Sequence, residues 1–297
     1  MHYGKLRVKV LSGCNKDYYL RLLKLRLFEK RIIEAVVFFR QGNFDPILIK
    51  GWSAAQLYPE PCQRYFSDID LIISPNEYEN AIKYSGNFDD EYLIDLHNGA
   101  RQLDSLSFEN LYSNSKLVKC GETNIRVLRP EDHLRVLCVH WLIDGGAKRN
   151  NLWDIYYAVE NRPSDFDWDR CLNVVSETRK RWIICTIGLA KKYLGLNLEN
   201  TPLADEKIEI PRWFIKALEK EWESGVLLRP LQYCLNDKRE LWRQIKKRIP
   251  PNPIQATIDM EGEFDDKSRI KYQIGDIFFR LKPSIIRLRN SILYGNK

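Results

Sequence analysis

Three aspartates and a histidine occupy two short segments that have the composition of β-strands. Asp68 and Asp70 lie two residues apart in SDIDLIIS, and Asp95 and His97 lie two residues apart in EYLIDLH. Side chains two residues apart on a strand point to the same face, opposite the apolar residues between them. Carboxylates held this close repel one another unless a cation lies between them. If the strands pair, three carboxylates meet at one place, where their oxygens suit Mg²⁺ or Mn²⁺.

The first part of the chain predicts a small sheet with helices, which must position these acids. Apolar residues recur at helical spacing over 17–41, where Asp17 can cap the helix and Gly42 can end it. Short apolar or alternating runs bounded by Pro, Gly and Asn predict strands. The expected elements are strands at 46–50, 67–74 and 91–97, helices at 51–58 and 77–84, and a hairpin at 116–128.

The pattern changes at Pro130, which suits the first turn of a helix and is followed by Glu131 and Asp132 at the positive helix end. Further helices are expected at 130–143, 150–160, 167–179, 181–194, 211–224, 236–248 and 269–294, with a break at 248–254 and a break or kink at Pro283. The sequence therefore predicts an α+β protein, with a sheet-containing domain at 1–128 and a helical domain at 129–297.

A Lys-Gly pair, a Tyr-Pro pair, an arginine and a DIDL run follow one another before IDLH. These residues are Lys50, Gly51, Tyr58, Pro59, Arg64, Asp68, Ile69, Asp70 and Leu71. Together they resemble the polymerase-β-type nucleotidyltransferase superfamily, and most closely a bacterial family of uncharacterised nucleotidyltransferases. The resemblance covers roughly residues 45–195 well. It implies a nucleotidyltransferase core, a small mixed sheet flanked by helices, and a helical region that completes the cleft.

By this resemblance, the reaction is transfer of a nucleoside monophosphate from an NTP, expected to be ATP, to a hydroxyl group. Asp68 and Asp70 would hold the nucleotide metal, and Asp95 would hold a second metal or accept the proton of the hydroxyl. Mg²⁺ or Mn²⁺ is the expected cofactor, because a triphosphate and three carboxylates repel one another without a cation.

Four further residues are expected to bind the nucleotide. Lys50 and Arg64 would balance phosphate charge, and Gly51 would let the backbone approach phosphate closely at a helix N-terminus. The superfamily usually has Gly-Ser or Gly-Gly after its first strand, whereas Trp52 follows Gly51 here. Ser53 is the nearest hydroxyl that could replace the missing serine, and it is also a candidate helix N-cap.

Two histidines are candidate accessory residues. His97 shares the predicted face of Asp95 and could orient a carboxylate or contact the acceptor. His140 lies on the predicted helix 130–143, seven residues after His133 and on the same helix face. Histidines at such positions are also common as hydrogen-bonded core residues.

The overall composition describes an ordinary soluble protein of 297 residues, 44% apolar and 29% charged. No apolar run approaches the roughly 18 residues of a membrane span, and no signal-peptide core is visible. The seven cysteines are dispersed without a CxxC pair, which argues against structural zinc and a disulfide framework. We therefore expect a cytoplasmic protein with reduced thiols and no membrane span.

The net charge of +7 is unevenly distributed. Residues 51–100 carry two basic and nine acidic side chains, a net −7, so the rest of the chain sums to +14. Six basic side chains against one acidic lie within 238–250, and seven against one within 269–297. Such stretches could contact a phosphate backbone, but no recognised nucleic-acid motif accompanies them. Nucleic acid is therefore a partner to consider rather than the favoured one.

The motifs of P-loop proteins, dinucleotide-binding folds, zincins and α/β-hydrolases are absent. A small molecule or sugar is the favoured hydroxyl acceptor. A protein hydroxyl that would receive AMP, or an RNA end, are the enzymatic alternatives. The non-enzyme alternative is an inactive nucleotide-binding or partner-docking protein, suggested by Trp52 and opposed by the three clustered acids.

Overall fold

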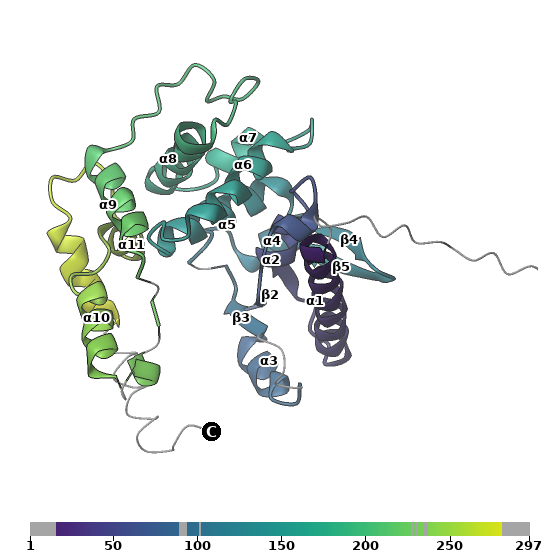
Figure 1. Cartoon of the computed structure of the whole chain (residues 1–297). Helices are drawn as coiled ribbons and strands as arrows, with labels where there is room; N and C mark the ends of the chain where they lie inside the picture. Colours follow the sequence, from purple (N-terminus) through teal and green to yellow (C-terminus); the bar gives the residue numbers. More distant parts are fainter. Residues whose placement is uncertain are drawn as a thin grey trace, which may run out of the picture. The chain divides into compact units, whose positions relative to one another are not determined.

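The computed structural model of the chain divides into two units (Figure 1). It describes residues 16–88, 94–100, 102–226, 228–229, 231–234 and 237–280. The first unit comprises Met1–Gly99 and Ser107–Arg129, and the second comprises Ala100–Leu106 and Pro130–Lys297. The short segment at Ala100–Leu106 therefore groups with the later part of the chain, which a single boundary in the sequence does not anticipate.

The first unit contains a five-stranded mixed sheet. Its strands are β1 (Ile47–Ile49), β2 (Ile69–Ile73), β3 (Ile94–Asn98), β4 (Lys116–Cys120) and β5 (Thr123–Val127). They lie in the order β3-β2-β1-β5-β4. β1 pairs antiparallel with β2 and parallel with β5, while β2 and β3 are parallel. The predicted α+β class and the small mixed sheet are confirmed.

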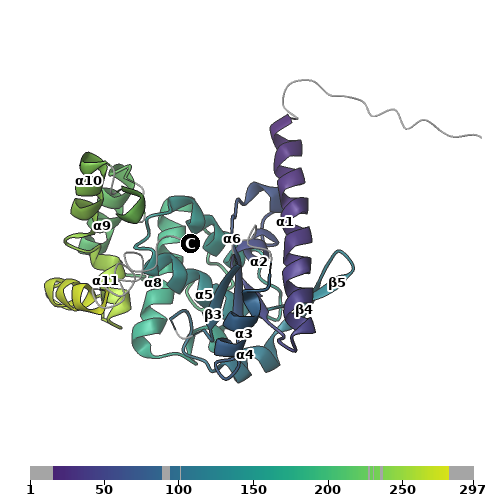
Figure 2. The same cartoon turned by 90° about the horizontal axis from the view of Figure 1, so that it is seen from below.

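The long helix α1 (Lys16–Gln41) covers one face of this sheet and runs beside β4 and β5 in Figure 2. Its buried residues Leu25, Ile32 and Phe39 join a hydrophobic cluster that also takes in Leu71 from β2 and Leu48 from β1. Burying such aliphatic and aromatic side chains stabilises the unit by about 1.5–3 kcal/mol each.

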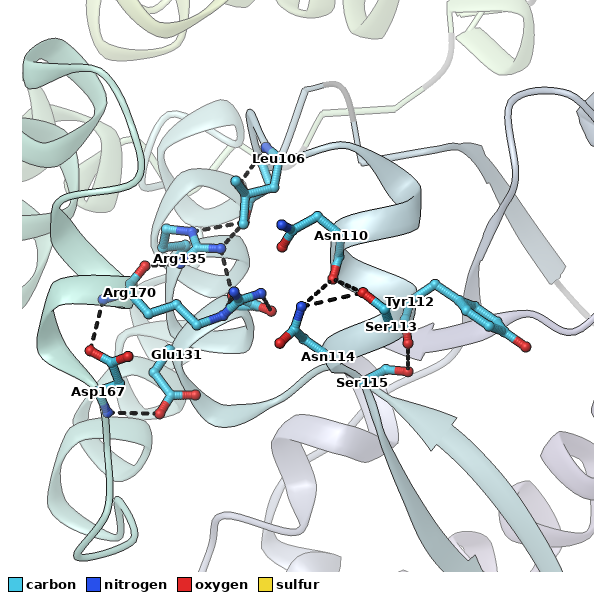
Figure 3. Close-up of polar contacts among 12 residues, drawn as sticks. Leu106, Asn110, Tyr112, Ser113, Asn114, Ser115, Glu131, Arg135, Asp167 and Arg170 are labelled. Atoms are coloured by element: carbon cyan, nitrogen blue, oxygen red, sulfur yellow. Dashed lines mark hydrogen bonds and ion pairs between the residues drawn. The ribbon is translucent and has the colours of Figure 1, made fainter.

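The other described elements of the first unit are three short helices and one 3₁₀ turn. They are α2 (Gly51–Ala55), η1 (Pro61–Gln63), α3 (Tyr78–Ser85) and α4 (Phe108–Asn114). The sequence did not predict α4. Ser107 caps this helix, because its hydroxyl accepts a hydrogen bond from the Asn110 N–H. Side chains near its C-terminal end also bond within the helix, as between Asn114 and Ser113 (Figure 3).

The second unit is helical where it is described, as predicted. Its elements are α5 (Pro130–Ile143), η2 (Arg149–Asn151), α6 (Leu152–Glu160), α7 (Trp168–Leu172), α8 (Glu177–Leu194), α9 (Arg212–Glu223), η3 (Leu231–Cys234), α10 (Lys238–Arg248) and α11 (Pro253–Asp259). Residues 270–280 are also helical. None of the described helices combines the length and the apolar composition needed to cross a membrane.

Two helix boundaries differ from the expectation. The single helix predicted over 167–179 is wrong, because α7 ends at Leu172 and Ser176 caps a new helix, α8. The predicted break at 248–254 contains the start of α11, where the Asn252 side chain accepts hydrogen bonds from two backbone N–H groups. Pro253 occupies the first turn there, so Asn-Pro was an overlooked start signal.

Parts of three expectations lie outside the described residues. They are the first residues of the strand predicted at 91–97, the later part of the helix predicted at 269–294 with Pro283, and Cys14. The other six cysteines are free and buried, in agreement with reduced thiols. Burial raises the pKa of Cys171 and of Cys185 to about 12, so both stay protonated and inert.

A buried charge network centres on Arg135 in the second unit (Figure 3). Arg135 Nε donates to Asp104 Oδ2 at 2.8 Å, and Nη2 donates to Asp132 Oδ1 at 2.7 Å. Arg170 donates to both oxygens of Asp132, from Nε at 2.9 Å and from Nη2 at 2.7 Å. Burial raises the pKa of Asp104, and the charge of Arg135 offsets part of that effect. The guanidinium groups thus compensate carboxylates that have no access to water.

Candidate functional site

Asp70, Asp95 and His97 form a compact cluster on two neighbouring strands. Each offers one ligand atom, and these atoms all lie within 4.8 Å of one another. His97 Nε2 lies 3.1 Å from Asp70 Oδ1 and 3.5 Å from Asp95 Oδ2. Two carboxylates and an imidazole at this separation can share one cation or one proton.

Strand register brings these residues together. β2 and β3 are parallel with Asp70 opposite Asp95 and Ile72 opposite His97, so alternate side chains form one row across the two strands. Leu71 packs into the hydrophobic cluster beside α1, so Asp70 lies on the opposite face of the sheet. The alternation that buries Leu71 therefore also holds the acidic row in place.

Lys50 follows β1 directly and lies beside the acidic row. β1 pairs antiparallel with β2, with Ile49 opposite Asp70. Regular alternation would turn Lys50 to the other face, but its left-handed backbone (φ 52°) breaks that alternation. Its Nζ lies 2.5 Å from Asp70 Oδ1, and the two side chains are only 8% and 3% exposed. Asp70 Oδ1 thus faces both a lysine ammonium and the His97 imidazole.

The surroundings of Asp70 keep it ionised. Burial alone would raise the pKa of this carboxyl, but the hydrogen bond from His97 and the charge of Lys50 outweigh burial and lower it below its ordinary value. A carboxylate that stays charged in a mostly buried position is suited to hold a metal ion or to orient a cationic group.

The backbone is unusual where β1 meets α2. Lys50 has φ 52° and ψ −135°, and Gly51 has φ 23°. A non-glycine residue held in such a conformation costs about 1–3 kcal/mol, and the surrounding structure must compensate for it. Such strain is concentrated at functional sites, and here it lies at the residue whose ammonium contacts Asp70.

Asp68 and Asp95 are more open than Asp70. Asp68 directly precedes β2 and is exposed, and it is not one of the three clustered residues. The side chain of Asp95 is 63% exposed. The structure therefore brings Asp70, Asp95 and the accessory candidate His97 together, while a metal-binding role for Asp68 stays a prediction.

The expected nucleotide-binding residues have different surroundings. Ser53 is buried, and its hydroxyl donates to the Leu48 carbonyl at 3.3 Å, so contact with a phosphate would require it to leave that partner. Arg64 is half-buried, and its Nη1 donates to the Tyr65 carbonyl at 3.0 Å. Gly51 begins α2 directly beside Lys50. Their roles in nucleotide binding stay predictions.

His140 lies on α5 of the second unit and is half-buried. It is not one of the three residues of the Asp70 cluster. Its accessory role stays a prediction.

The clustered residues fit a divalent cation. Carboxylate oxygens suit Mg²⁺ and Mn²⁺, and an imidazole nitrogen moves the preference toward Mn²⁺ and other transition metals. Lys50 competes for one of the same oxygens, because its ammonium already contacts Asp70 Oδ1. Binding a cation there would require Lys50 to move, and phosphate oxygens could receive its ammonium.

Comparison with known proteins gives one structural likeness. No protein-family model matches the chain, and no curated protein matches it. The crystal structure of an antigenic nucleotidyltransferase-like protein from Paracoccidioides brasiliensis is similar over 60% of this chain and 89% of its own. The identity is 12% and the TM-score 0.39. A likeness with this identity and TM-score carries no conclusion about function.

Two features of the sites were not anticipated from the sequence. The contact of Lys50 with Asp70 depends on antiparallel pairing of β1 with β2, which no local motif specifies. The Arg135 network joins Asp104 to α5 across 31 residues. The nearby Asp132 and Arg135, at helical spacing, were a visible signal for half of that network.

Proposed function

We propose that this protein is a metal-dependent nucleotidyltransferase that transfers a nucleoside monophosphate from an NTP to a hydroxyl group. The observation that carries the proposal is the row of Asp70, Asp95 and His97 beside Lys50. It combines carboxylates on adjacent strands with a cation at a strand–helix junction. This combination suits a highly anionic substrate that must be held close to carboxylates.

Asp70 and Asp95 would hold Mg²⁺ or Mn²⁺, with His97 as a further ligand or as an orienting group and Asp68 approaching from before β2. The bound ion would supply positive charge that polarises the α-phosphate and stabilises the leaving pyrophosphate. Lys50 would pass from Asp70 to a phosphate oxygen as the nucleotide enters, which keeps its buried charge compensated.

The reaction forms a bond between the acceptor oxygen and the α-phosphorus and breaks the bond from that phosphorus to the pyrophosphate oxygen. The hydroxyl proton needs an acceptor near the reacting oxygen. Asp95 would accept it in place of binding a second metal, because its side chain is 63% exposed, while the buried Asp70 contacts Lys50 and His97.

A small molecule or sugar is the favoured acceptor, with ATP as the favoured donor. A protein hydroxyl or an RNA end would use the same chemistry. The decisive experiment incubates the protein with each α-labelled NTP and Mg²⁺ or Mn²⁺, and offers a metabolite extract, RNA or cell lysate in separate reactions. The fraction that becomes labelled identifies the acceptor class.

The variant Asp70→Asn tests the site in the same assay. Loss of one preorganised electrostatic contact in a catalytic centre costs about 10²–10³-fold in rate, so labelling should fall by at least that factor. Asp17→Asn, an exposed carboxylate in the first turn of α1, is the matched control and should label normally. Undiminished labelling by Asp70→Asn would refute the assigned site.

The Lys50–Asp70 contact also favours a second candidate, an inactive nucleotide-binding protein. An internal ammonium already neutralises the carboxylate that a catalytic metal would need. Under this alternative, an NTP raises the melting temperature without any transfer of label to any fraction. Transfer that requires divalent metal excludes it.

A further inference from the structure

A cavity lies in the first unit, between α1 and residues 62–66, which include the end of η1. Its volume is about 280 Å³, close to the lower end of the range for small-molecule sites. It is bounded by the N-terminal half of α1 on one side and by residues 62–66 on the other. Its size suits one small ligand rather than a macromolecular segment.

The cavity is lined by four cations, Arg21, Lys24, Arg31 and Arg64, and none of its described lining residues is acidic. Three of the four come from one helix and recur at spacings of three, seven and ten residues, so they share one side of α1. Like charges gathered around a concave surface raise the local concentration of anions.

The rest of the lining is largely aromatic and apolar. The Phe28 and Phe66 rings meet edge to face, with centroids 5.1 Å apart and planes at 70°. Arg31 lies over the Phe28 ring at 5.6 Å. Tyr65 is 77% exposed, which leaves an aromatic surface available to a ligand. An apolar or flat group could pack here while an anionic group faces the cations.

This cavity is separate from the Asp70 cluster. None of the clustered residues, nor Lys50, lines it. Its inner residues Leu25 and Phe66 belong to the hydrophobic cluster that also contains Leu71, on the α1 side of the sheet. Asp70 precedes Leu71 on β2, so its side chain points to the opposite face of the sheet. A ligand in the cavity therefore does not depend on the metal-binding residues.

We propose that this cavity binds a phosphate-bearing small molecule that also carries a flat or apolar group. The phosphate contacts Arg21 and Lys24, with Arg31 and Arg64 on either side, and the flat group packs against Phe28 and Tyr65. A free nucleotide and another phosphorylated metabolite share this chemistry. The inference does not require that the Asp70 site transfers nucleotides.

The test uses the full chain carrying Lys50→Met and Asp70→Asn, with EDTA present, so that neither a metal ion nor the Lys50 ammonium can bind a phosphate at the Asp70 cluster. Isothermal titration compares three probes: AMP, which has both phosphate and base; ribose 5-phosphate, which lacks the base; and adenosine, which lacks the phosphate. AMP should bind at least tenfold more tightly than adenosine, because charged hydrogen bonds contribute roughly that factor or more. Its affinity should fall as NaCl is raised.

The double variant Arg21→Ala/Lys24→Ala should weaken AMP binding by at least about tenfold and leave adenosine nearly unchanged. Both side chains are exposed, so their loss should not unfold the protein. The matched control is Lys16→Ala/Lys30→Ala, which removes the same charge from exposed positions of the same helix that do not line the cavity. Tyr65→Ala should weaken AMP more than ribose 5-phosphate.

Ribose 5-phosphate binding as tight as AMP binding would assign the cavity to phosphorylated metabolites without a base and would overturn the role of Tyr65. Equal affinity for AMP and adenosine would overturn the proposal, as would equal effects of the two double variants. RNA binding that only Arg21→Ala/Lys24→Ala abolishes, without binding of the small phosphates, would also overturn it. Failure of label transfer by the unsubstituted protein would leave this inference intact.

Discussion

Two buried carboxylates, Asp70 in the first unit and Asp132 in the second, are compensated in different ways. Asp132 receives fork-shaped guanidinium groups from Arg135 and Arg170, and both of its oxygens are bonded. At Asp70, a flexible lysine ammonium and an imidazole converge on one oxygen, Oδ1. A planar guanidinium fixes its partner, whereas an ammonium on a four-carbon stem can leave.

The neighbours of the two carboxylates also differ in how far they are exposed to solvent. Around Asp132, the side chains of Arg135 and Asp104 are almost completely enclosed. Beside Asp70 lies Asp95, which is 63% exposed, and the strained backbone of Lys50. The first arrangement stabilises the fold. The second places the exposed carboxylate of Asp95 next to the buried carboxylate of Asp70, so a cation from solvent can reach the cluster at Asp95.

The largest effect should come from breaking the enclosed network. Arg135→Leu leaves Asp104 and Asp132 buried with fewer partners, so the free energy of unfolding should fall by about 3–5 kcal/mol. Denaturant unfolding measures this directly. Arg243→Leu, which removes an exposed guanidinium paired with Glu240, should change it by less than about 0.5 kcal/mol. If both variants lost the same free energy of unfolding, the enclosed Arg135 network would stabilise the fold no more than an exposed ion pair does.

A half-buried carboxylate, Asp259, shows a third arrangement, in which two carboxylates share one guanidinium group. It shares Arg280 with Asp276, whose Oδ2 has no hydrogen-bond partner among the described residues. Burial and the neighbouring Asp276 raise the pKa of Asp259 to about 6, although Arg280 acts in the opposite direction. One guanidinium group therefore does not fully compensate the buried Asp276 and the half-buried Asp259.

Because the pKa of Asp259 is higher in the folded than in the unfolded chain, the folded state binds its proton more tightly. The stabilisation is present at low pH and is lost as the pH rises from about 4 through 6. Asp259→Asn should flatten this part of the melting-temperature profile. The exposed Asp205→Asn should leave its slope unchanged; equal profiles for both variants would contradict the assignment.

Lys50→Met should have a smaller effect on folding and a different dependence on metal. Without metal, Asp70 keeps His97 as its one remaining counter-group among the described residues, so stability should fall by about 1–2 kcal/mol in EDTA. Mn²⁺ should restore it, because an external cation replaces the ammonium. At the same time, NTP binding should weaken. Lys30→Met, exposed on α1, is the control; a loss that Mn²⁺ cannot restore would place Lys50 with the structural ion pairs.

Local signals were enough to predict most elements of this fold. The alternation around Asp70, the periodicity of α1 and Pro130 at the start of α5 are decided within a few residues. The short helices α4 and α11 were missed because their periodic runs are too brief, although Ser107 and Asn252 cap them. Cap residues were the better signal at those positions.

The candidate site was only partly predictable. The DxD and DxH spacings placed Asp70, Asp95 and His97 on matching faces, but the registers of three strands decide which atoms meet. Asp68 was expected in the cluster from its spacing and from the family resemblance, and it lies just outside β2. Side-chain partners such as Lys50 depend on pairing across the sheet, which a linear pattern does not encode.

The smallest effect on stability, and the sharpest on function, should come from Asp95→Asn. Its carboxylate is mostly exposed, so the free energy of unfolding should change by less than about 0.5 kcal/mol. Mn²⁺ should raise the melting temperature of the unsubstituted protein but not that of the variant, because one of two carboxylate ligands is gone. Glu122→Gln, exposed in the β4–β5 turn, serves as control. If Asp95→Asn destabilised the fold as strongly as Arg135→Leu, Asp95 would be part of the structural framework, and the contrast between an enclosed network and an open site would fail at its central residue.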